Sequence, residues 1–370
     1  MSNKNILAIF IVILVIRFIV VFIPPQFTTD LARSIFYGQQ FWRHGFDVYS
    51  LTPQQLDPNF HIIDPTTHQL AWPNNKYDYG IISLLYYAII GLLPFNSSIL
   101  IIIAKVIFNL VDIVSFLLLI LIYPKKKEVP ILFWILIVPF SSIEGQALSV
   151  TILFFASSLY FYTKEHKSIA YSILALGFHW KYVTLFILPY FVLNDLCLYY
   201  IAEEQRKPKF RSVLKPLFFF IIIQLGLMFP ILFSPYILSY ISFEGNLPVQ
   251  SKPWNPFYIG EPFTIASFLL LIFVFYILIS WYQLDEEIKE KFFKGIGFIP
   301  LLGLYGFLLI YKYAFPWYWL WSFPLYSILP VKARKIFFIF LSICIIAAVE
   351  FINWTVGFPF FTQYLFSFKT

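Results

Sequence analysis

Long apolar runs, interrupted by short polar segments, repeat along the chain. Runs such as 6–23 and 217–233 are unbroken over about the length that a helix needs to cross ~30 Å of hydrocarbon. The first run has no small-residue cleavage site after it, so it is interpreted as an uncleaved helix. The pattern predicts an all-α fold, a polytopic transmembrane helical bundle that forms a single integral membrane domain over residues 1–370.

Composition supports the same class of protein. Of the 370 residues, 60% are apolar and only 12% are charged, whereas a soluble domain carries about 25% charge. The net charge is +7, but the basic residues stand in short clusters between apolar runs. They are therefore interpreted as topology signals rather than as a nucleic-acid surface, and no nucleic-acid partner is expected.

The basic clusters define the expected topology, because the positive-inside rule assigns them all to the cytosol. Alternation between them gives about eleven crossings, with the C-terminus outside, provided that Tyr79–Leu93 does not cross. Residues 24–97 then form the first extracytoplasmic loop, with interfacial or re-entrant helices. The predicted crossings are 6–23, 98–122, 130–140, 147–162, 168–178, 182–200, 216–233, 262–282, 295–310, 317–331 and 336–351.

Polar residues that topology does not explain fall on the predicted outer side. Asp30 follows the first run directly, and with Thr29 it could cap a helix, while an ion pair with Arg33 one turn later is the plain alternative. The functional interpretation is a carboxylate that acts as a base or binds a metal. Glu144 and Gln146 lie in a tight turn that needs no carboxylate, and Asp78 begins the next apolar segment.

Two lysines, Lys181 and Lys312, are also expected outside, against the positive-inside bias. A lysine binds phosphate as a point charge. Together with Arg33 they could neutralise a phosphate or diphosphate on a lipid carrier. The aromatic belt of a membrane protein accounts for Trp317 and its neighbours but not for Lys312.

A third group of polar residues lies inside the membrane-length runs. The spacing of Lys105, Asn109 and Asp112 places them on one helix face. They are expected to form either a structural Lys–Asp pair or part of a functional path. Arg17 and Glu350 are a candidate pair between the first and last helices. The sequence has no P-loop, GxGxxG, HExxH or paired CxxC motif, so a nucleotide site has no support.

Several blocks of the chain resemble polyprenyl-phosphate-dependent glycosyltransferases of the GT-C type. The likeness is greatest to the first mannosyltransferase of glycosylphosphatidylinositol synthesis and its prokaryotic relatives. The blocks that carry it are Thr29-Asp30-Leu31-Ala32-Arg33, Gly45-Phe46-Asp47-Val48-Tyr49, Tyr77-Asp78-Tyr79-Gly80, Lys105-Val106-Ile107-Phe108 with Asp112, Phe133-Trp134 through Pro139, Glu144-Gly145-Gln146, Gly177-Phe178-His179-Trp180-Lys181 with Leu188-Pro189, Asn255-Pro256-Phe257-Tyr258 and Tyr318-Trp319-Leu320-Trp321 with Pro324.

This resemblance implies a GT-C-like fold and transfer of a sugar, by analogy mannose, from a polyprenyl or dolichyl phosphate to a lipid-linked glycan acceptor. Asp30 would be the catalytic base. The active site would face the outside of a prokaryotic plasma membrane or the lumen of the endoplasmic reticulum, in contact with membrane lipid. The other expected roles are acceptor or metal orientation by Glu144, Gln146 and Asp78, phosphate binding by Lys181, Lys312 and Arg33, and sugar or lipid contacts by His179, Trp180, Tyr258 and Trp317.

Two further points stay open at the level of sequence. Close relatives carry a paired D-x-D motif near the first helix, where this chain has Pro24 and Pro25, so a divalent cation (Mg²⁺ or Mn²⁺) on Asp30 and Glu144 is left undecided. The competing function is a polytopic transporter or lipid flippase with a mid-membrane path along Lys105 and Asp112. A non-catalytic scaffold would instead scatter its outer polar residues.

Overall fold

A computed structural model describes residues 3–25, 29–63, 70, 73–74, 76–77, 79–201, 210–232, 300, 303–304 and 316–328. Within those ranges the chain is mostly helical and contains no strand. The predicted all-α class is therefore confirmed. The α-helices are α1 (Asn3–Val20), α2 (Asp30–His44), α3 (Pro53–Leu56), α4 (Ile81–Gly91), α5 (Ser97–Ile122), α6 (Glu128–Leu136), α7 (Leu148–Thr163), α8 (Lys167–Trp180), α9 (Leu188–Ile201) and α10 (Phe210–Leu232).

Shorter helical segments connect or follow these helices. A π-helical segment, η2 (Val138–Ile143), extends α6, and η3 (Tyr182–Ile187) precedes α9. The 3₁₀ segments η1 (Gly45–Tyr49), η6 (Pro316–Ser322) and η7 (Pro324–Ile328) complete the described elements. Residues 317–331 were expected to form one crossing helix, and the described part instead consists of η6 and η7. Pro316 and Pro324 begin these segments, and proline interrupts the hydrogen bonding of a continuous helix.

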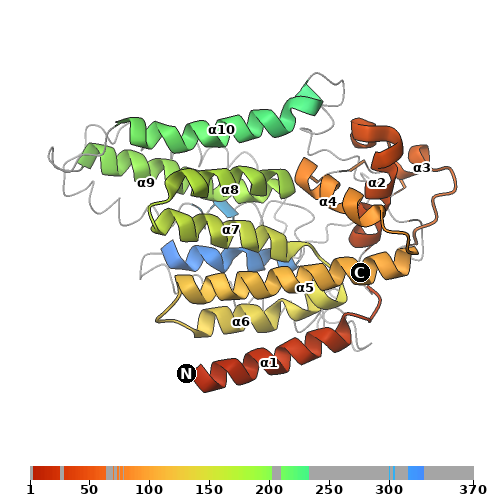
Figure 1. Cartoon of the computed structure of the whole chain (residues 1–370), viewed down its shortest axis with the longest axis horizontal. Coiled ribbons are helices and arrows are strands. Elements are labelled where there is room, and N and C mark those ends of the chain that lie inside the picture. The colour runs from red at the N-terminus through yellow and green to blue at the C-terminus, as the bar shows by residue number, and fades with distance from the viewer. Residues whose placement is uncertain are drawn as a thin grey trace, which may run out of the picture.

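The longer helices run side by side, and α2, α3 and α4 gather at one end of them (Figure 1). We call this end the loop end. The opposite end, called the basic end, holds the start of α1 and the lysine-bearing turns 123–127 and 164–166. The described basic clusters thus share one end of the bundle, as the sequence predicted.

One described helix, Ser97–Ile122, is long and apolar enough to cross a membrane by length and composition. It agrees with the predicted crossing 98–122. Shorter apolar helices overlap the predicted segments 130–140, 147–162, 182–200 and 216–233, and helix α8 overlaps 168–178. The segments 262–282, 295–310 and 336–351 fall mainly or wholly outside the described residues, so the predicted number of crossings stays a prediction.

Helix α4 differs from the bundle helices in length and position. It has 11 residues, about 16 Å at 1.5 Å per residue, which is short for a hydrocarbon core of ~30 Å. It packs against α2 at the loop end rather than along the bundle (Figure 1). This placement fits the prediction that Tyr79–Leu93 belongs to the first loop.

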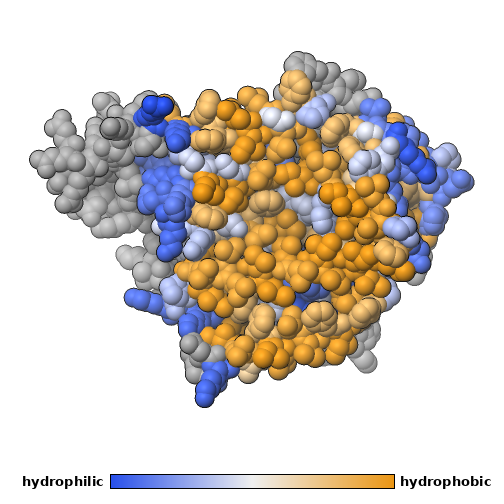
Figure 2. Space-filling model, viewed as in Figure 1, coloured by the Kyte–Doolittle hydropathy of each residue, from blue (hydrophilic) through white to orange (hydrophobic). Residues whose placement is uncertain are grey.

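Apolar and polar residues are distributed in an unusual way over the fold. On the face shown in Figure 2, large apolar side chains cover the surface between the two ends, while hydrophilic residues concentrate at the ends. Charged residues such as Arg17, Lys105 and Asp112 lie buried inside. The exposed apolar side chains include Ile11, Val15, Ile19, Leu110, Val114, Leu117, Leu121, Phe218, Ile222, Leu225 and Phe229.

Candidate functional site

The loop end contains the start of α2, where Asp30 opens the first turn. Thr29 occupies the N-cap position but makes no side-chain capping hydrogen bond, so the predicted cap at Thr29 is not formed. A carboxylate in the first turn is favoured by the helix dipole. Tyr87 of α4 lies close to Asp30: burial raises the pKa of the Tyr87 phenol well above its usual range, and neighbouring groups including the Asp30 carboxylate raise it further. Tyr87 therefore stays neutral beside that charge.

The turn that carries Glu144 packs directly against α2. Gly145 adopts a positive φ of 69°, a conformation that favours glycine. A Cβ atom at Gly145 would clash with the Leu31 side chain and lie 3.0 Å from Cγ of Lys105. Glu144 is fully buried and interacts electrostatically with Lys105. The Lys105 ammonium also donates to the carbonyl of Ile23, at 2.6 Å, so Lys105 links the end of α1 to the turn.

The C-terminal end of α8 joins the same region. A Cβ atom at Gly80, which caps α4, would clash with the backbone of His179, so α4 begins directly on α8. Trp180 donates from Nε1 to the carbonyl of Ala147 at 3.3 Å, just after the Glu144 turn. Trp180 shares one apolar cluster with residues of three other helices: Leu31, Ile35, Tyr87, Ile90, Leu100, Ala104 and Phe108.

His179 and Trp180, predicted to contact a sugar or lipid, are both buried. The ring of Trp180 packs against Tyr86 at a centroid distance of 5.5 Å, and His179 interacts with Gln224 of α10. Both side chains contact protein groups and join α8 to its neighbours.

Lys181 is enclosed by three aromatic rings. Its Nζ atom lies 5.0 Å from the ring of Tyr79, 4.4 Å from that of Tyr318 and 5.1 Å from that of Trp321. It also donates to the Tyr318 hydroxyl at 3.3 Å. Cation–π contacts of this kind stabilise an ammonium group without neutralising it. Lys181 therefore lies at the loop end, at a site where η6 and the end of α8 meet.

Two buried polar groups flank the contact between Gly145 and Leu31. Neither Gln146 Nε2 nor Thr29 Oγ1 has a hydrogen-bond partner within the part of the chain that the structure describes. Most buried polar groups in proteins are hydrogen-bonded, so such exceptions need a reason. A bound ligand would supply one. Arg33, one turn after Asp30, is buried on α2.

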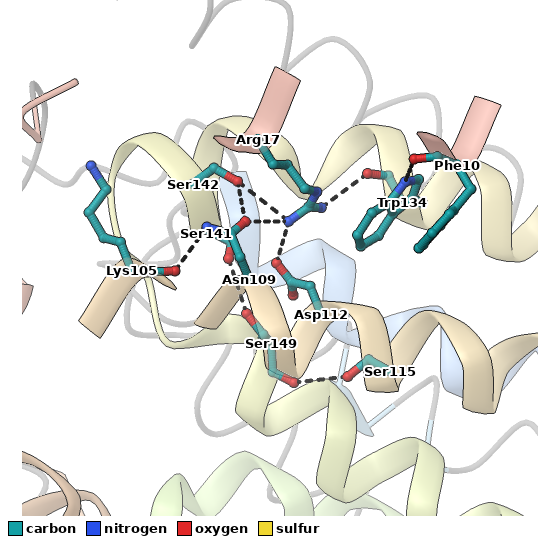
Figure 3. A network of polar contacts seen from close by, with 10 residues as sticks. All are labelled: Phe10, Arg17, Lys105, Asn109, Asp112, Ser115, Trp134, Ser141, Ser142 and Ser149. Atoms are coloured by element: carbon teal, nitrogen blue, oxygen red, sulfur yellow. Dashed lines mark hydrogen bonds and ion pairs between the residues drawn. The ribbon is translucent and has the colours of Figure 1, made fainter. Parts of the chain in front are cut away.

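A second polar group lies inside the bundle, and we call it the Arg17 network (Figure 3). It consists of Arg17, Asn109, Asp112, Ser142 and the Trp134 carbonyl. Arg17 Nη1 donates to Asp112 Oδ2 at 2.7 Å and to Asn109 Oδ1 at 2.9 Å. The guanidinium also lies 3.9 Å from the centre of the Trp134 ring. Arg17 and Asp112 are 1% and 0% exposed, respectively, so this is a fully buried ion pair.

This network corrects the expected pairing of the intramembrane charges. Asp112 pairs with Arg17. Lys105, seven residues earlier on the same face, instead interacts electrostatically with Glu144 and donates to the Ile23 carbonyl. The expected Lys105–Asp112 pair is therefore wrong. The Arg17–Asp112 ion pair joins α1 to α5, and the suggested Arg17–Glu350 pair stays a prediction. Glu350 lies outside the described residues.

Some predicted site residues cannot be placed. Asp78, Lys312 and Tyr258 lie outside the described residues, and the same holds for the side chain of Trp317. Within the described ranges no group of three or more His, Cys, Asp or Glu side chains is arranged to hold a metal ion. Whether a cation binds Asp30 and Glu144 therefore stays open.

Sequence reasoning missed two features. The first is the set of rings around Lys181: Tyr318 follows Lys181 by 137 positions, and nothing in the local sequence pairs them. The second feature is a polar cluster near the basic end, in which Asp195 accepts hydrogen bonds from Tyr162 and Tyr171 and pairs with Lys167. An aspartate inside an apolar run was the available signal, because such a charge needs a partner.

Comparison of the chain with protein-family models, with curated proteins and with solved structures gave no match.

Proposed function

We propose that this chain is a multi-pass membrane glycosyltransferase. It would move a sugar, by the resemblance mannose, from a polyprenyl or dolichyl phosphate to a lipid-linked acceptor on the extracytoplasmic side. Residues 24–97 would form the first loop on that side, and the basic end would face the cytosol.

The exposed apolar surface supports the membrane part of this proposal. Contiguous exposed apolar patches on soluble monomers rarely exceed a few hundred Å², yet here apolar side chains cover the flank of the bundle between two hydrophilic ends (Figure 2). Lipid would satisfy that surface. Charges inside a bilayer face the bundle interior and pair with one another, as Arg17 and Asp112 do.

The observation that carries the proposed reaction is the gathering of opposite charges at the loop end. Asp30 begins α2, the Glu144 turn packs on the next residue of α2, and Lys181 ends α8 beside the first residues before α4. These segments are distant in sequence and share one apolar cluster. This gathering supports an active site over a non-catalytic scaffold.

In the proposed reaction the acceptor hydroxyl oxygen attacks the anomeric carbon of the donor sugar. A bond forms between these two atoms, and the bond from the anomeric carbon to the phosphate oxygen breaks. Asp30 accepts the hydroxyl proton, and polyprenyl phosphate leaves with the electron pair of the broken bond. Lys181, Arg33 and Lys312 stabilise the negative charge on that phosphate. Glu144 and Gln146 orient the acceptor.

The test uses the purified protein with radiolabelled polyprenyl-phosphate mannose and a panel of lipid-linked acceptors. Asp30→Asn keeps the shape of the side chain but removes the base, so transfer is expected to fall by at least about 10²-fold. The matched control is Glu165→Gln, which changes an exposed carboxylate at the basic end and should leave transfer unchanged. A fully active Asp30→Asn protein would remove the assigned base.

One observation supports the alternative function of a transporter or lipid flippase: the charged Arg17 network lies inside the bundle. Both members of its ion pair are sealed by protein, however, and Lys105 does not continue a path to Asp112. Vesicles with the purified protein distinguish the two functions. Movement of a labelled lipid-linked sugar across the bilayer, without any change of its covalent structure, would favour the transporter.

A further inference from the structure

The segment before Glu144 is a π-helix, and this determines where the carboxylate lies. In η2 the Glu144 N–H donates to the carbonyl of Pro139, five residues back, at 3.2 Å. The N–H of Gln146 donates to the carbonyl of Phe140, six residues back, at 2.8 Å. Single π-helical turns are rare and occur frequently at functional sites. Such a wide turn needs contacts from outside itself to keep its shape.

The Arg17 network supplies those contacts (Figure 3). Arg17 Nη2 donates to the carbonyl of Trp134 at 3.1 Å, in the last turn of α6, and Nη1 reaches Ser142 Oγ at 3.4 Å. Ser142 donates to Asn109 Oδ1 at 2.6 Å. One guanidinium thus connects α1 to α5, to α6 and to η2, at the start and near the end of the segment that leads to Glu144.

The same network also reaches Lys105, the residue that faces Glu144. Asn109 Nδ2 donates to the Lys105 carbonyl at 2.9 Å, while its Oδ1 accepts from both Arg17 and Ser142. Asn109 therefore ties the helix turn that carries Lys105 to the turn that precedes Glu144. Planar guanidinium geometry makes these contacts directional, and the buried Asp112 carboxylate supplies the countercharge that holds the guanidinium inside the bundle.

We infer that Arg17, held by Asp112, is a positioning residue that sets Glu144 against Lys105 without touching substrate. This inference rests on the proposed transferase function for its catalytic consequence, whereas the positioning itself can be measured independently. Lysine at position 17 keeps the charge but lacks the guanidinium fork. Arg17→Lys should therefore leave a folded protein in which the Glu144 turn is displaced.

The first measurement is independent of transfer. Cys197 and Cys344 are replaced by serine and Gln146 by cysteine, because Gln146 is buried directly beyond Glu144. The reporter is the rate at which a maleimide labels Cys at position 146 in folded, monodisperse protein. Adding Arg17→Lys or Ser142→Ala should raise this rate by about 10-fold, since the turn loses its anchor. The matched control, Lys167→Met, removes one member of the ion pair near the basic end and should leave the rate unchanged.

The second measurement is transfer kinetics in the background with Gln146 intact. A small misplacement of an orienting group can cost about 10²-fold, so Arg17→Lys should lower kcat by about 10- to 100-fold while KM for the donor changes less than about two-fold. Arg17 and Ser142 belong to one hydrogen-bond network, so the effects of Arg17→Lys and Ser142→Ala on kcat should be non-additive in the double variant. A purely structural role would lower the yield of folded protein without this split.

An unchanged labelling rate in folded Arg17→Lys protein would overturn the inference. If that variant does not fold, Ser142→Ala decides, and an unchanged labelling rate and kcat in it would overturn the inference equally. Failure of the proposed function looks different. Wild-type protein would then transfer no sugar with any acceptor, while the labelling rates would still report whether Arg17 holds the turn.

Discussion

Two of the buried charge clusters in the described part of the chain differ in what they connect. The Arg17 network joins α1, α5, α6 and η2 and leads to the Glu144 turn. The cluster around Asp195 joins α7, α8 and α9 near the basic end, through hydrogen bonds from Tyr162 and Tyr171 and an ion pair with Lys167. The first cluster thus fixes a π-helical segment and the turn after it, whereas the second fixes only α-helices against each other.

The two clusters also differ in their access to water. In the Arg17–Asp112 pair both side chains are sealed, whereas Lys167 is 22% exposed beside a buried Asp195. A sealed charge cannot be rehydrated when its partner is removed, but a lysine at an edge can move into solvent. We call Arg17–Asp112 the deep pair and Lys167–Asp195 the edge pair. The comparison predicts that the deep pair controls both the stability of the fold and the position of the Glu144 turn. The edge pair should control stability alone.

The largest effect is expected from removing one member of the deep pair. Asp112→Leu leaves the Arg17 charge buried without its carboxylate and should destabilise the fold by about 3–5 kcal/mol. Thermal unfolding of the detergent-solubilised protein, followed by tryptophan fluorescence, measures this loss. The double variant Arg17→Met with Asp112→Leu removes both charges and should recover most of the stability. A double variant no more stable than Asp112→Leu would show that the charge itself is not the cause.

A smaller loss is expected at the edge. Asp195→Asn removes the charge but keeps an oxygen that can accept from Tyr162 or Tyr171. Hydrogen bonds to charged groups contribute about 1.5–3 kcal/mol, so the loss should lie near the lower end of that range. The same fluorescence melt measures it, with transfer activity at a permissive temperature as the second readout. Reduced kcat in folded protein would contradict the assignment of a purely structural role.

Removing one hydroxyl from the edge cluster should have a milder effect. Tyr171→Phe deletes the donor 3.0 Å from Asp195 Oδ2 while keeping the ring contact with Phe191. The expected destabilisation is about 1 kcal/mol. Tyr162→Phe is the comparison, because its hydroxyl also donates to the Phe191 carbonyl and accepts from Asn194. Tyr162→Phe should therefore be the more damaging of the two, and the reverse order would reject the assigned hydrogen-bond pattern.

The smallest effect is expected at the outer edge of the same cluster. Glu165 is 78% exposed and lies 3.6 Å from Lys167. Exposed pairs of this kind contribute about 0–1 kcal/mol and are screened by salt. Glu165→Gln should leave the melting curve within experimental error at high salt. A clear salt-independent loss would mean that Glu165 is part of the structural cluster.

The loop end shows how far the sequence leads at the candidate site. The pattern of charge and apolar runs predicted that Asp30, Glu144 and Lys181 share one side, and all three lie at the loop end. The partners of these residues were not predictable. Lys105 faces Glu144 instead of Asp112, and Lys181 is surrounded by rings from the α4 region and η6. Helical spacing describes neighbours along one helix, but these contacts join different helices.

By itself the amino-acid sequence determined the helical class, the approximate position of the described long helices and the end at which the basic turns lie. Those properties depend on local apolar periodicity and on residue type, which act over a few turns of chain. Only the tertiary structure decided that Arg17 pairs with Asp112, 95 positions away. A buried charge demands a partner, but which partner it meets depends on how the helices pack.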